Sequence, residues 1–325
     1  MQKDIAEKAT SKFAKEVQEG LTSFPKYLSS KYFYDEQGDA LFQEIMAMPE
    51  YYLTNAEFEI LETQKERITV HFSNKTEPFD LFELGAGDGK KTKILLKHLS
   101  DKGYAFEYLP IDISQNALDQ LEKSLLSELP NLKISALQGT YFDTLKDIGR
   151  EKGRKKVILF LGSNIGNLLH PNAISFLRQL KDVMAPNDLL LMGMDQKKKP
   201  QTILDAYNDK AGITEAFNKN VLKRINTELG GNFNVDEFLH WEVYDPESGT
   251  AKSYLVSQKE QEVHIEALDL KVGFNPWETI HTEISQKYDD DTVKWLAKES
   301  GLEIVTSFAD GEKLFKDYLL KRTTL

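Results

Sequence analysis

The sequence has no cysteine and few histidines, and both shortages restrict its chemistry. Without cysteine the chain can form no disulfide, no thiol nucleophile and no thiolate metal site. The six histidines are scattered, and none pairs with another at i, i+4 or at another spacing typical of metal ligands. Neither a G-x-S-x-G segment nor a phosphate-binding P-loop is present. We therefore expect no metal site.

Positive charge and long apolar runs are also in short supply. The 41 lysines and arginines are outnumbered by 52 aspartates and glutamates, and the formal net charge of −11 argues against a general nucleic-acid binder. No apolar run approaches the length of a membrane span, and residues 1–19 lack an apolar signal core. We therefore expect a cytoplasmic chain without nucleic-acid or membrane partners. Its 325 residues are enough for two domains.

One stretch of the chain has the pattern of a nucleotide-binding unit. The apolar run Asp80–Leu84 predicts a buried strand, the glycine-rich turn Gly85–Gly89 follows it, and a helical pattern begins at Lys90. A second predicted strand, 105–111, is followed by Asp112. The glycines allow a sharp turn and close approach of a ligand, and the acid can accept hydrogen bonds from both ribose hydroxyls. Either NAD or S-adenosylmethionine would suit such a unit.

The spacing of the glycines favours S-adenosylmethionine. In the dinucleotide fingerprint G-x-G-x-x-G the third glycine packs the helix against the strand, whereas Lys90 stands at that position here. The pattern instead runs Glu83-x-Gly85-x-Gly87-x-Gly89. A carboxylate at Glu83 suits a cationic sulfonium and would fit a pyrophosphate poorly. We therefore predict S-adenosylmethionine as the cofactor, with NAD as the alternative.

The order of the predicted elements indicates an α/β fold. The predicted strands of its first part are Asp80–Leu84, Ala105–Ile111, Lys133–Leu137, Val157–Leu161 and Asp188–Met194. Helices alternate with them, which predicts a doubly wound parallel sheet with helices on both faces. After residue 197 a helical block and then antiparallel strands follow, including a hairpin that turns at Asp245–Gly249. From Asp291 the α/β pattern returns.

This order predicts two domains. The Rossmann-like sheet domain would consist of residues 62–196 and 287–325. Residues 197–286 would form an α+β insertion that packs with residues 1–61 as a second domain. We expect no repeat or low-complexity tract to add further parts.

Two further groups of residues stand where a ligand could bind. The loop Gly162–Asn167 follows a predicted strand, at the sheet edge where ligands of doubly wound folds bind. Asn167 could equally cap the next helix. Glu283 and Ser285 alternate with an apolar residue, so both point to one face of a predicted strand and could hydrogen-bond the two nitrogens of an imidazole. A solvated strand face would have the same pattern.

Aromatic residues gather in the N-terminal segment, at 32–34 and 51–52. Tyrosines in an apolar wall can bind a carboxylate or an amine through their hydroxyls while the rings exclude water. They can also be ordinary core rings, and the sequence alone leaves both interpretations open.

Taken together, these residues resemble the histidine-specific N-alpha-methyltransferases of ergothioneine biosynthesis. The resemblance covers essentially the whole chain. The motifs that carry it are Lys31-Tyr32-Phe33-Tyr34-Asp35, Pro49-Glu50-Tyr51-Tyr52-Leu53-Thr54, Glu83-Leu84-Gly85-Ala86-Gly87, Leu161-Gly162-Ser163-Asn164-Ile165-Gly166-Asn167, Ala206-Tyr207-Asn208-Asp209, Phe217-Asn218-Lys219-Asn220 and Thr282-Glu283-Ile284-Ser285. The resemblance implies a class I methyltransferase sheet with an inserted substrate-binding domain.

The resemblance also implies roles for individual residues. The substrate residues it implies are Tyr51 and Asn167 at the amino-acid end, Tyr34 and Tyr207 close to the reacting amine, and Glu283 and Ser285 at the imidazole. We take Tyr34 and Tyr207 as the catalytic candidates. The predicted cofactor-binding residues are Glu83, Gly85, Gly87, Asp112 and Gly162.

One position departs from the family pattern. Ser253 stands where the family commonly has a methionine that lines the imidazole side of the pocket, and a smaller residue leaves more room there. We keep Ser253 among the predicted substrate-binding residues.

The implied reaction is methylation of the α-amino group of free L-histidine, three times in succession, by a monomer. The sequence offers no dedicated strong base, so we expect tyrosine hydroxyls and a water to carry the proton away. The alternatives are methylation of another aromatic amino acid or amine, an NAD-dependent oxidoreductase, and a donor-binding protein without catalysis.

Overall fold

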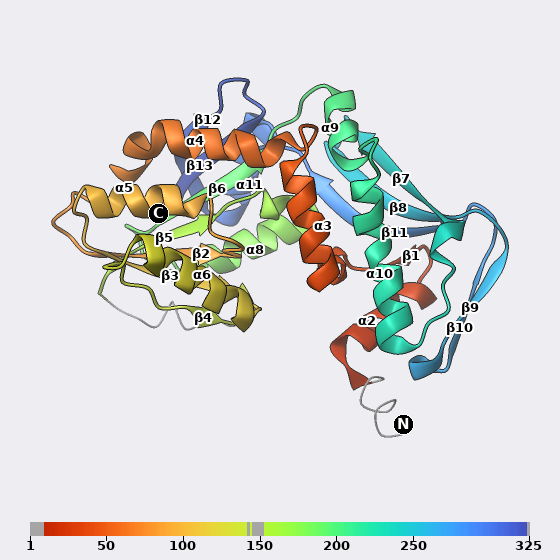
Figure 1. Cartoon of the computed structure of the whole chain (residues 1–325). Coiled ribbons are helices and arrows are strands. Elements are labelled where there is room, and N and C mark those ends of the chain that lie inside the picture. The colour runs from red at the N-terminus through yellow and green to blue at the C-terminus, as the bar shows by residue number, and fades with distance from the viewer. Residues whose placement is uncertain (1–9, 142–143, 145–152, 324–325) are drawn as a thin grey trace. The chain divides into compact units, whose positions relative to one another are not determined.

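The structure, a computed structural model, describes residues 10–141, 144 and 153–323. The chain divides into two units (Figure 1): unit 1 comprises residues 1–52 and 198–285, and unit 2 comprises residues 53–197 and 286–325. The sequence places the first boundary at residue 61, whereas unit 2 begins at Leu53. The reason is helix α4 (Tyr52–Thr69), whose Glu57 and Gln64 hydrogen-bond to the backbone of Gly162 and Ala309 in unit 2.

Unit 2 contains a seven-stranded sheet in the order β12-β13-β6-β5-β2-β3-β4 within the described residues. Its strands are β2 (Phe79–Leu84), β3 (Phe106–Asp112), β4 (Leu137–Gln138), β5 (Lys155–Phe160), β6 (Leu189–Asp195), β12 (Leu302–Ala309) and β13 (Phe315–Arg322). The strands from β6 to β4 are parallel, and β13 joins β6 and β12 in antiparallel pairs. The predicted α/β fold with a doubly wound sheet is confirmed, and the antiparallel pairs of β13 are an addition to the parallel sheet that the sequence predicts.

Helices cover both faces of this sheet. They are α4, α5 (Thr92–Asp101), α6 (Gln115–Glu128), α8 (His170–Val183) and α11 (Asp290–Ser300). The apolar sides of α8 and α11 pack on one face against alternate strand residues such as Phe82 and Leu84. The residue between these two, Glu83, points to the opposite face and reaches Thr92 at the start of α5. Burial on both faces explains why apolar residues predominate in the central strands β5 and β6.

Two elements of unit 2 differ from their predicted limits. Helix α5 begins at Thr92 and not at Lys90, because the glycine-rich turn continues through residue 91. The strand predicted at 133–137 is reduced to β4 and one isolated bridge between Tyr108 and Ile134. It lies at the edge of the sheet, where only β3 is available to pair with it.

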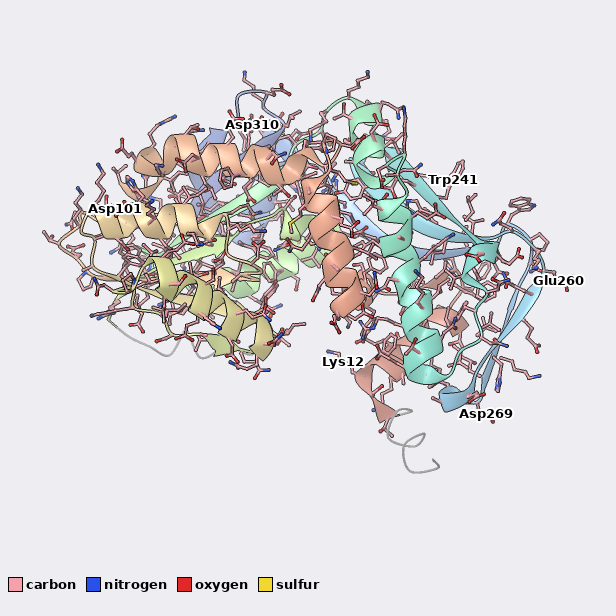
Figure 2. All side chains as sticks on the ribbon, viewed as in Figure 1. Lys12, Asp101, Trp241, Glu260, Asp269 and Asp310 are labelled. Carbon is pink, nitrogen blue, oxygen red and sulfur yellow. The ribbon has the colours of Figure 1, made fainter. Side chains whose placement is uncertain are left out.

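In the part of unit 1 that the structure describes, a four-stranded sheet has the order β1-β11-β8-β7. These strands are β1 (Lys26–Tyr27), β7 (Phe238–Asp245), β8 (Thr250–Ser257) and β11 (Thr279–Gln286), with β9 (Gln261–Ile265) and β10 (Leu270–Phe274) as a separate hairpin. Its helices are α2 (Lys12–Thr22), α3 (Glu36–Ala47), α9 (Pro200–Tyr207) and α10 (Ile213–Leu229). The β7–β8 hairpin turns where the sequence predicts it. Trp241 of β7 is 55% exposed (Figure 2).

The N-terminal segment is part of the unit 1 core. Phe13, Val17 and Leu21 of α2 and Phe33 pack with Phe217 and its neighbours on α10 in a single apolar cluster. Strand β1 pairs in parallel with β11, so the N-terminal segment adds a strand that the sequence does not predict to this sheet. The pairing of Lys26 with Ile280 joins residues far apart along the chain, which no local pattern can reveal.

Candidate functional site

The glycine-rich turn of unit 2 follows the carboxyl end of β2. Gly85 has a φ of +73°, a conformation that favours glycine, and a Cβ added there would lie 2.3 Å from the hydroxyl of Tyr141. The corresponding position over Gly87 is open, with no heavy atom within 4 Å. Tyr141 is a residue that the sequence reasoning missed. The backbone at Gly87 is thus accessible to a ligand at the sheet edge where such ligands bind.

Glu83 is buried and hydrogen-bonded within unit 2, whereas the sequence suggests that its carboxylate faces the ligand. Its side chain is 3% exposed, and its two carboxylate oxygens accept hydrogen bonds from Thr92 and Tyr108. Burial is the main cause that raises the pKa of Glu83 to about 7. Glu83 therefore ties the glycine-rich turn to α5 and β3, and direct attraction of a sulfonium by this carboxylate stays a prediction.

Glu83 should make the stability of the fold depend on pH. Its pKa is about 7 in the folded chain and 4.5 ordinarily, so the folded state retains this proton to higher pH than the unfolded state does. From about pH 5 to about pH 7, this group should lower the free energy of unfolding by about 2 kcal/mol. Urea unfolding at both pH values should show this loss in the wild type and not in Glu83→Gln. An equal loss in both proteins would contradict the assignment.

Two predicted cofactor-binding residues, Asp112 and Gly162, lie at the ends of the strands on either side of β2. Asp112 is the last residue of β3, and Gly162 comes shortly after β5. Asp112 is half-buried and accepts a hydrogen bond from the backbone N–H of Ser114 at 3.0 Å. Gly162 has a φ of +74°, and its N–H points to the carboxylate of Glu57. Both residues lie at carboxyl ends of parallel strands, as the sequence predicts for a ligand-binding edge.

The rest of the 162–167 loop is held against β6 and the segment after β11. The N–H of Asp195 donates to the hydroxyl of Ser163 at 3.0 Å, and the hydroxyl of Tyr288 donates to the carbonyl of Ile165 at 3.2 Å. Asn167 is exposed and does not cap α8, whose N-cap is Leu169 without a side-chain hydrogen bond. The capping interpretation of Asn167 is therefore wrong, and its predicted ligand contact stays a prediction.

A cation next to Gly162 escaped the sequence reasoning. Lys91 forms an ion pair with Glu57, and its Nζ lies 3.4 Å from the position of a Cβ on Gly162. Its side chain is 25% exposed, whereas that of Glu57 is fully buried. Burial lowers the pKa of Lys91, but the charge and the hydrogen bond of Glu57, together with the nearby carboxyl groups, outweigh burial and raise the pKa. Lys91 therefore carries a positive charge that a carboxylate ligand can approach.

Unit 1 contains a small pocket with aromatic and polar walls. It encloses about 30 Å³ and is lined by Phe42, Ile45, Tyr51, Ala206, Tyr207, Thr214, Phe217, Asn218, His240, Ser253 and Glu283. The rings of Tyr51 and Tyr207 meet edge to face with centroids 6.3 Å apart, and the ring of Phe42 lies beside Tyr51 in the same way. Predicted substrate residues from four separate segments thus line one pocket.

The polar end of the pocket is formed by β7, β8 and β11. Tyr207 and Ser285 are hydrogen-bonded through their hydroxyls at 2.7 Å. Ser253 donates to a carboxylate oxygen of Glu242 at 2.6 Å and lies 3.5 Å from a carboxylate oxygen of Glu283. These contacts bring Glu283 and Ser285 to the same side of β11, in agreement with their alternation in the sequence.

Tyr34 belongs to the same aromatic group. Its ring packs edge to face on Phe42 and Phe217, at centroid distances of 5.5 and 5.3 Å. Although 43% of Tyr34 is exposed, burial of its hydroxyl end and the negative charge of Glu283 raise the pKa of Tyr34 well above its ordinary value. The Tyr34 phenol therefore holds its proton more firmly than an ordinary tyrosine does.

Two buried polar residues position this pocket and were not predicted from the sequence. His240 accepts at Nδ1 from the amide of Asn218 at 2.8 Å and donates from Nε2 to the carbonyl of Tyr207 at 2.9 Å. Burial lowers the pKa of His240, which keeps the ring neutral for this pattern. The neutral ring thereby fixes the backbone that carries Tyr207.

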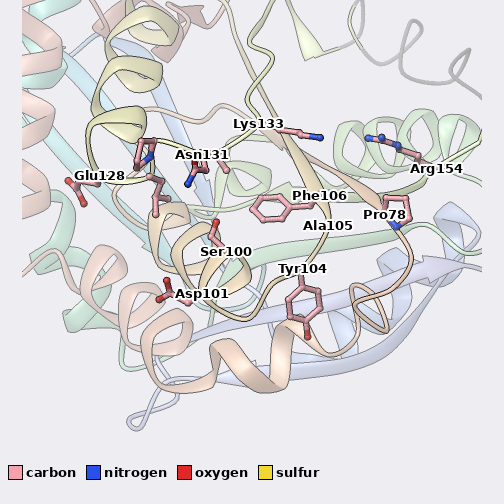
Figure 3. A pocket seen from close by; sticks show the side chains of 13 residues that line it. Pro78, Ser100, Asp101, Tyr104, Ala105, Phe106, Glu128, Asn131, Lys133 and Arg154 are labelled. Carbon is pink, nitrogen blue, oxygen red and sulfur yellow. The ribbon is translucent and has the colours of Figure 1, made fainter.

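A larger hollow of about 500 Å³ lies at the opposite, amino-terminal edge of the unit 2 sheet (Figure 3). Pro78, Phe106 and Lys133 line it, close to where their strands begin. Arg154, at its rim, pairs with Asp80 at 3.1 Å. Since none of the predicted site residues lies there, we do not assign it to the site.

Within residues 10–141, 144 and 153–323, no cluster of acidic or histidine side chains could hold a metal ion. In the same part of the chain, no helix combines the length and the apolar character needed to cross a membrane.

Comparison with known proteins gives consistent matches. A family model described as histidine-specific methyltransferase, SAM-dependent, matches residues 13–322. The histidine N-alpha-methyltransferase of Mycolicibacterium smegmatis is 36% identical over 297 residues, which cover 91% of each chain. The 4-dimethylallyltryptophan N-methyltransferase of Claviceps fusiformis is 25% identical and covers 89% of this chain and 86% of its own. In fold, the mitomycin 7-O-methyltransferase MmcR aligns at a TM-score of 0.50 and 12% identity, covering 98% of this chain and 71% of its own.

Proposed function

The chain belongs to the family of S-adenosylmethionine-dependent, histidine-specific methyltransferases, and from this premise we propose that it methylates the α-amino group of free L-histidine. One observation carries the choice of substrate. Glu283 and the hydrogen-bonded pair Tyr207–Ser285 stand together at the aromatic-walled pocket of unit 1. A carboxylate and a hydroxyl on one face can bind the two nitrogens of an imidazole.

The residues of unit 2 fit the methyl donor. The open backbone at Gly87, the carboxylate of the half-buried Asp112 and the partly exposed side chain of Lys91 offer contacts for a nucleoside sugar and an amino-acid carboxylate. We propose that Gly85, Gly87, Asp112 and Gly162 bind it. When bound, S-adenosylmethionine supplies a methyl group on a positively charged sulfur.

The residues around the pocket would bind the substrate amine and exclude water. We propose that Tyr51 and Asn167 hold the amino-acid end and that Tyr34 and Tyr207 lie next to the amine. Transfer requires a neutral amine held in line with the methyl group, which is mainly a matter of positioning. Since the Tyr34 phenol holds its proton firmly, it would orient the amine by hydrogen bonding while water carries the proton away.

We further propose that three methyl groups are added, to give N,N,N-trimethylhistidine. Each addition leaves a bulkier and finally a permanently cationic nitrogen. The aromatic faces of Tyr34, Phe42, Tyr51 and Tyr207 suit such a group, because a quaternary ammonium is attracted to the face of an aromatic ring. No basic side chain is among the residues that line the pocket, apart from the neutral ring of His240.

The second candidate is methylation of another aromatic amino acid or amine. The observation that favours it is Ser253, which is 3% exposed, lines the pocket and is small. Its hydroxyl donates a hydrogen bond to Glu242, so the polar end of the pocket includes a second carboxylate besides that of Glu283. A larger or more polar ring than imidazole would then find space and acceptors there.

Mass spectrometry distinguishes these candidates. The purified protein is incubated with S-adenosylmethionine and each common amino acid separately. We expect a gain of three methyl groups on histidine and on no other amino acid. A gain on tryptophan or tyrosine would support the second candidate, and a gain of one or two groups on histidine would contradict the trimethyl product. Absence of transfer to any of them would contradict both candidates.

A further inference from the structure

Three ionisable side chains from distant segments of unit 2 lie close together next to Gly162. They are Glu57 on α4, Lys91 before α5 and Asp317 on β13. The side chains of Glu57 and Asp317 have no exposed surface, whereas Lys91 reaches solvent. Glu57 links this group to the backbone of Gly162. Its carboxylate forms an ion pair with Lys91, and its two oxygens accept a hydrogen bond from the N–H of Gly162 at 2.8 and 2.9 Å.

A glycine on strand β6 leaves space for the carboxyl groups of Glu57 and Asp317. On β6, Gly193 lies directly opposite Asp317 in the antiparallel register. A Cβ at Gly193 would lie only 2.1 Å from a carboxylate oxygen of Glu57. The missing side chain therefore leaves room for the Glu57 carboxylate beside Asp317. The other cross-strand neighbour of Asp317 is Phe308, which brings no charge.

Asp317 lacks the donors that a buried carboxylate requires. Neither of its oxygens receives a hydrogen bond from a donor group in the described part of the chain. An ionised carboxylate in that state would be strongly unfavourable. Burial first, and then the negative charge of Glu57, raise the pKa of Asp317 well above its ordinary value, whereas the positive charge of Lys91 acts in the other direction. One proton held between the two acids satisfies both of them, with Asp317 as the donor and Glu57 as the acceptor.

We propose that Asp317 is a neutral carboxylic acid that donates a hydrogen bond to Glu57. Glu57 in turn holds the backbone at Gly162 and the Lys91 ammonium in place beside the methyl donor. The proposal rests on the donor-binding role proposed above for Gly162. Two acids that share one proton carry one negative charge, which balances Lys91. Loss of that proton would add a second negative charge and disfavour a carboxylate-bearing ligand beside Lys91.

The test compares two substitutions with the wild type. Asp317→Asn keeps a neutral hydrogen-bond donor next to Glu57 and cannot ionise, whereas Asp317→Ala removes the donor. Calorimetry with S-adenosylhomocysteine should give a Kd within about twofold of the wild type for the Asn variant and a Kd at least about tenfold weaker for the Ala variant. Glu303→Gln, on the exposed side of the adjacent strand β12, is the matched control and should bind like the wild type.

A spectroscopic measurement separates this role from simple packing. The infrared difference spectrum between the wild type and Asp317→Asn should contain the carbonyl band of a protonated carboxylic acid. Absence of that band, or equal weakening of binding in the Asn and Ala variants, would overturn the proposal. If the Ala variant does not fold, the infrared carbonyl band and the Kd of the Asn variant are the measurements that test the proposal. A wild type that binds no S-adenosylhomocysteine would instead contradict the proposed function.

Discussion

Replacing Glu283 with alanine should raise the KM for L-histidine by about 10- to 100-fold, the range for losing a hydrogen bond to a charged group. Glu283 lines the unit 1 pocket and lies 3.5 Å from the hydroxyl of Ser253. It is the charged acceptor available there for an imidazole N–H. The affinity for S-adenosylmethionine should stay nearly unchanged, because the residues proposed to bind it all belong to unit 2. Steady-state kinetics gives the first value and calorimetry with S-adenosylmethionine alone gives the second.

Glu283→Gln is the matched control for this prediction. It keeps the size of the side chain and one acceptor oxygen but removes the charge, so its KM should lie between those of the wild type and the alanine variant. Equal losses of histidine and donor binding in Glu283→Ala would show that the substitution disturbs the whole protein. An unchanged KM for histidine would exclude Glu283 from imidazole recognition.

Replacing Lys287 with methionine should lower the free energy of unfolding by about 3–5 kcal/mol, the usual cost of removing one partner of a buried ion pair. Lys287 Nζ lies 2.8 Å from Asp195 Oδ2, and both side chains are fully buried in unit 2. The substitution leaves the negative charge of Asp195 in a site of low dielectric. Because a domain is typically stable by only about 5–15 kcal/mol, the midpoint of urea unfolding should shift strongly.

Two further variants test the cause of this loss. Lys321→Met removes a cation from the exposed cross-strand pair with Glu303, at 3.1 Å, and should cost no more than about 1 kcal/mol. The double variant Lys287→Met with Asp195→Asn removes both buried charges and should be more stable than Lys287→Met alone. A double variant that is less stable than the single one would contradict the ion-pair explanation.

The predicted S-adenosylmethionine-binding residues show how much of the fold local sequence patterns can predict. The strand, glycine turn, helix and strand between Asp80 and Asp112 are contiguous, and each element has its own signal, so their existence and order are confirmed. The limits of some elements differ from the prediction: α5 begins two residues later than predicted, and the strand predicted at 133–137 is reduced to β4 at the edge of the sheet. The family resemblance is also confirmed, because the motifs that carry it are short and distinctive.

The surroundings of Glu83 show what the sequence could not reveal. The motif suggests a carboxylate that faces the ligand, but Thr92 and Tyr108 hold its oxygens in the interior. The direction of a side chain depends on which donors lie next to it, and these come from other elements. The same reason applies to His240, whose ring is fixed by Asn218 and by the backbone of Tyr207.

The sequence by itself determined the α/β class, the order of the elements, the nucleotide-binding unit and the membership of the family. Periodicity, glycine spacing and short motifs all act between residues that are near one another in the chain. Only the tertiary structure decided which distant residues meet: Glu57 with Gly162, 105 positions apart, and Tyr207 with Ser285, 78 positions apart. Such contacts form because packing brings complementary buried groups together, and hydrogen bonding of buried polar groups then selects the exact partners.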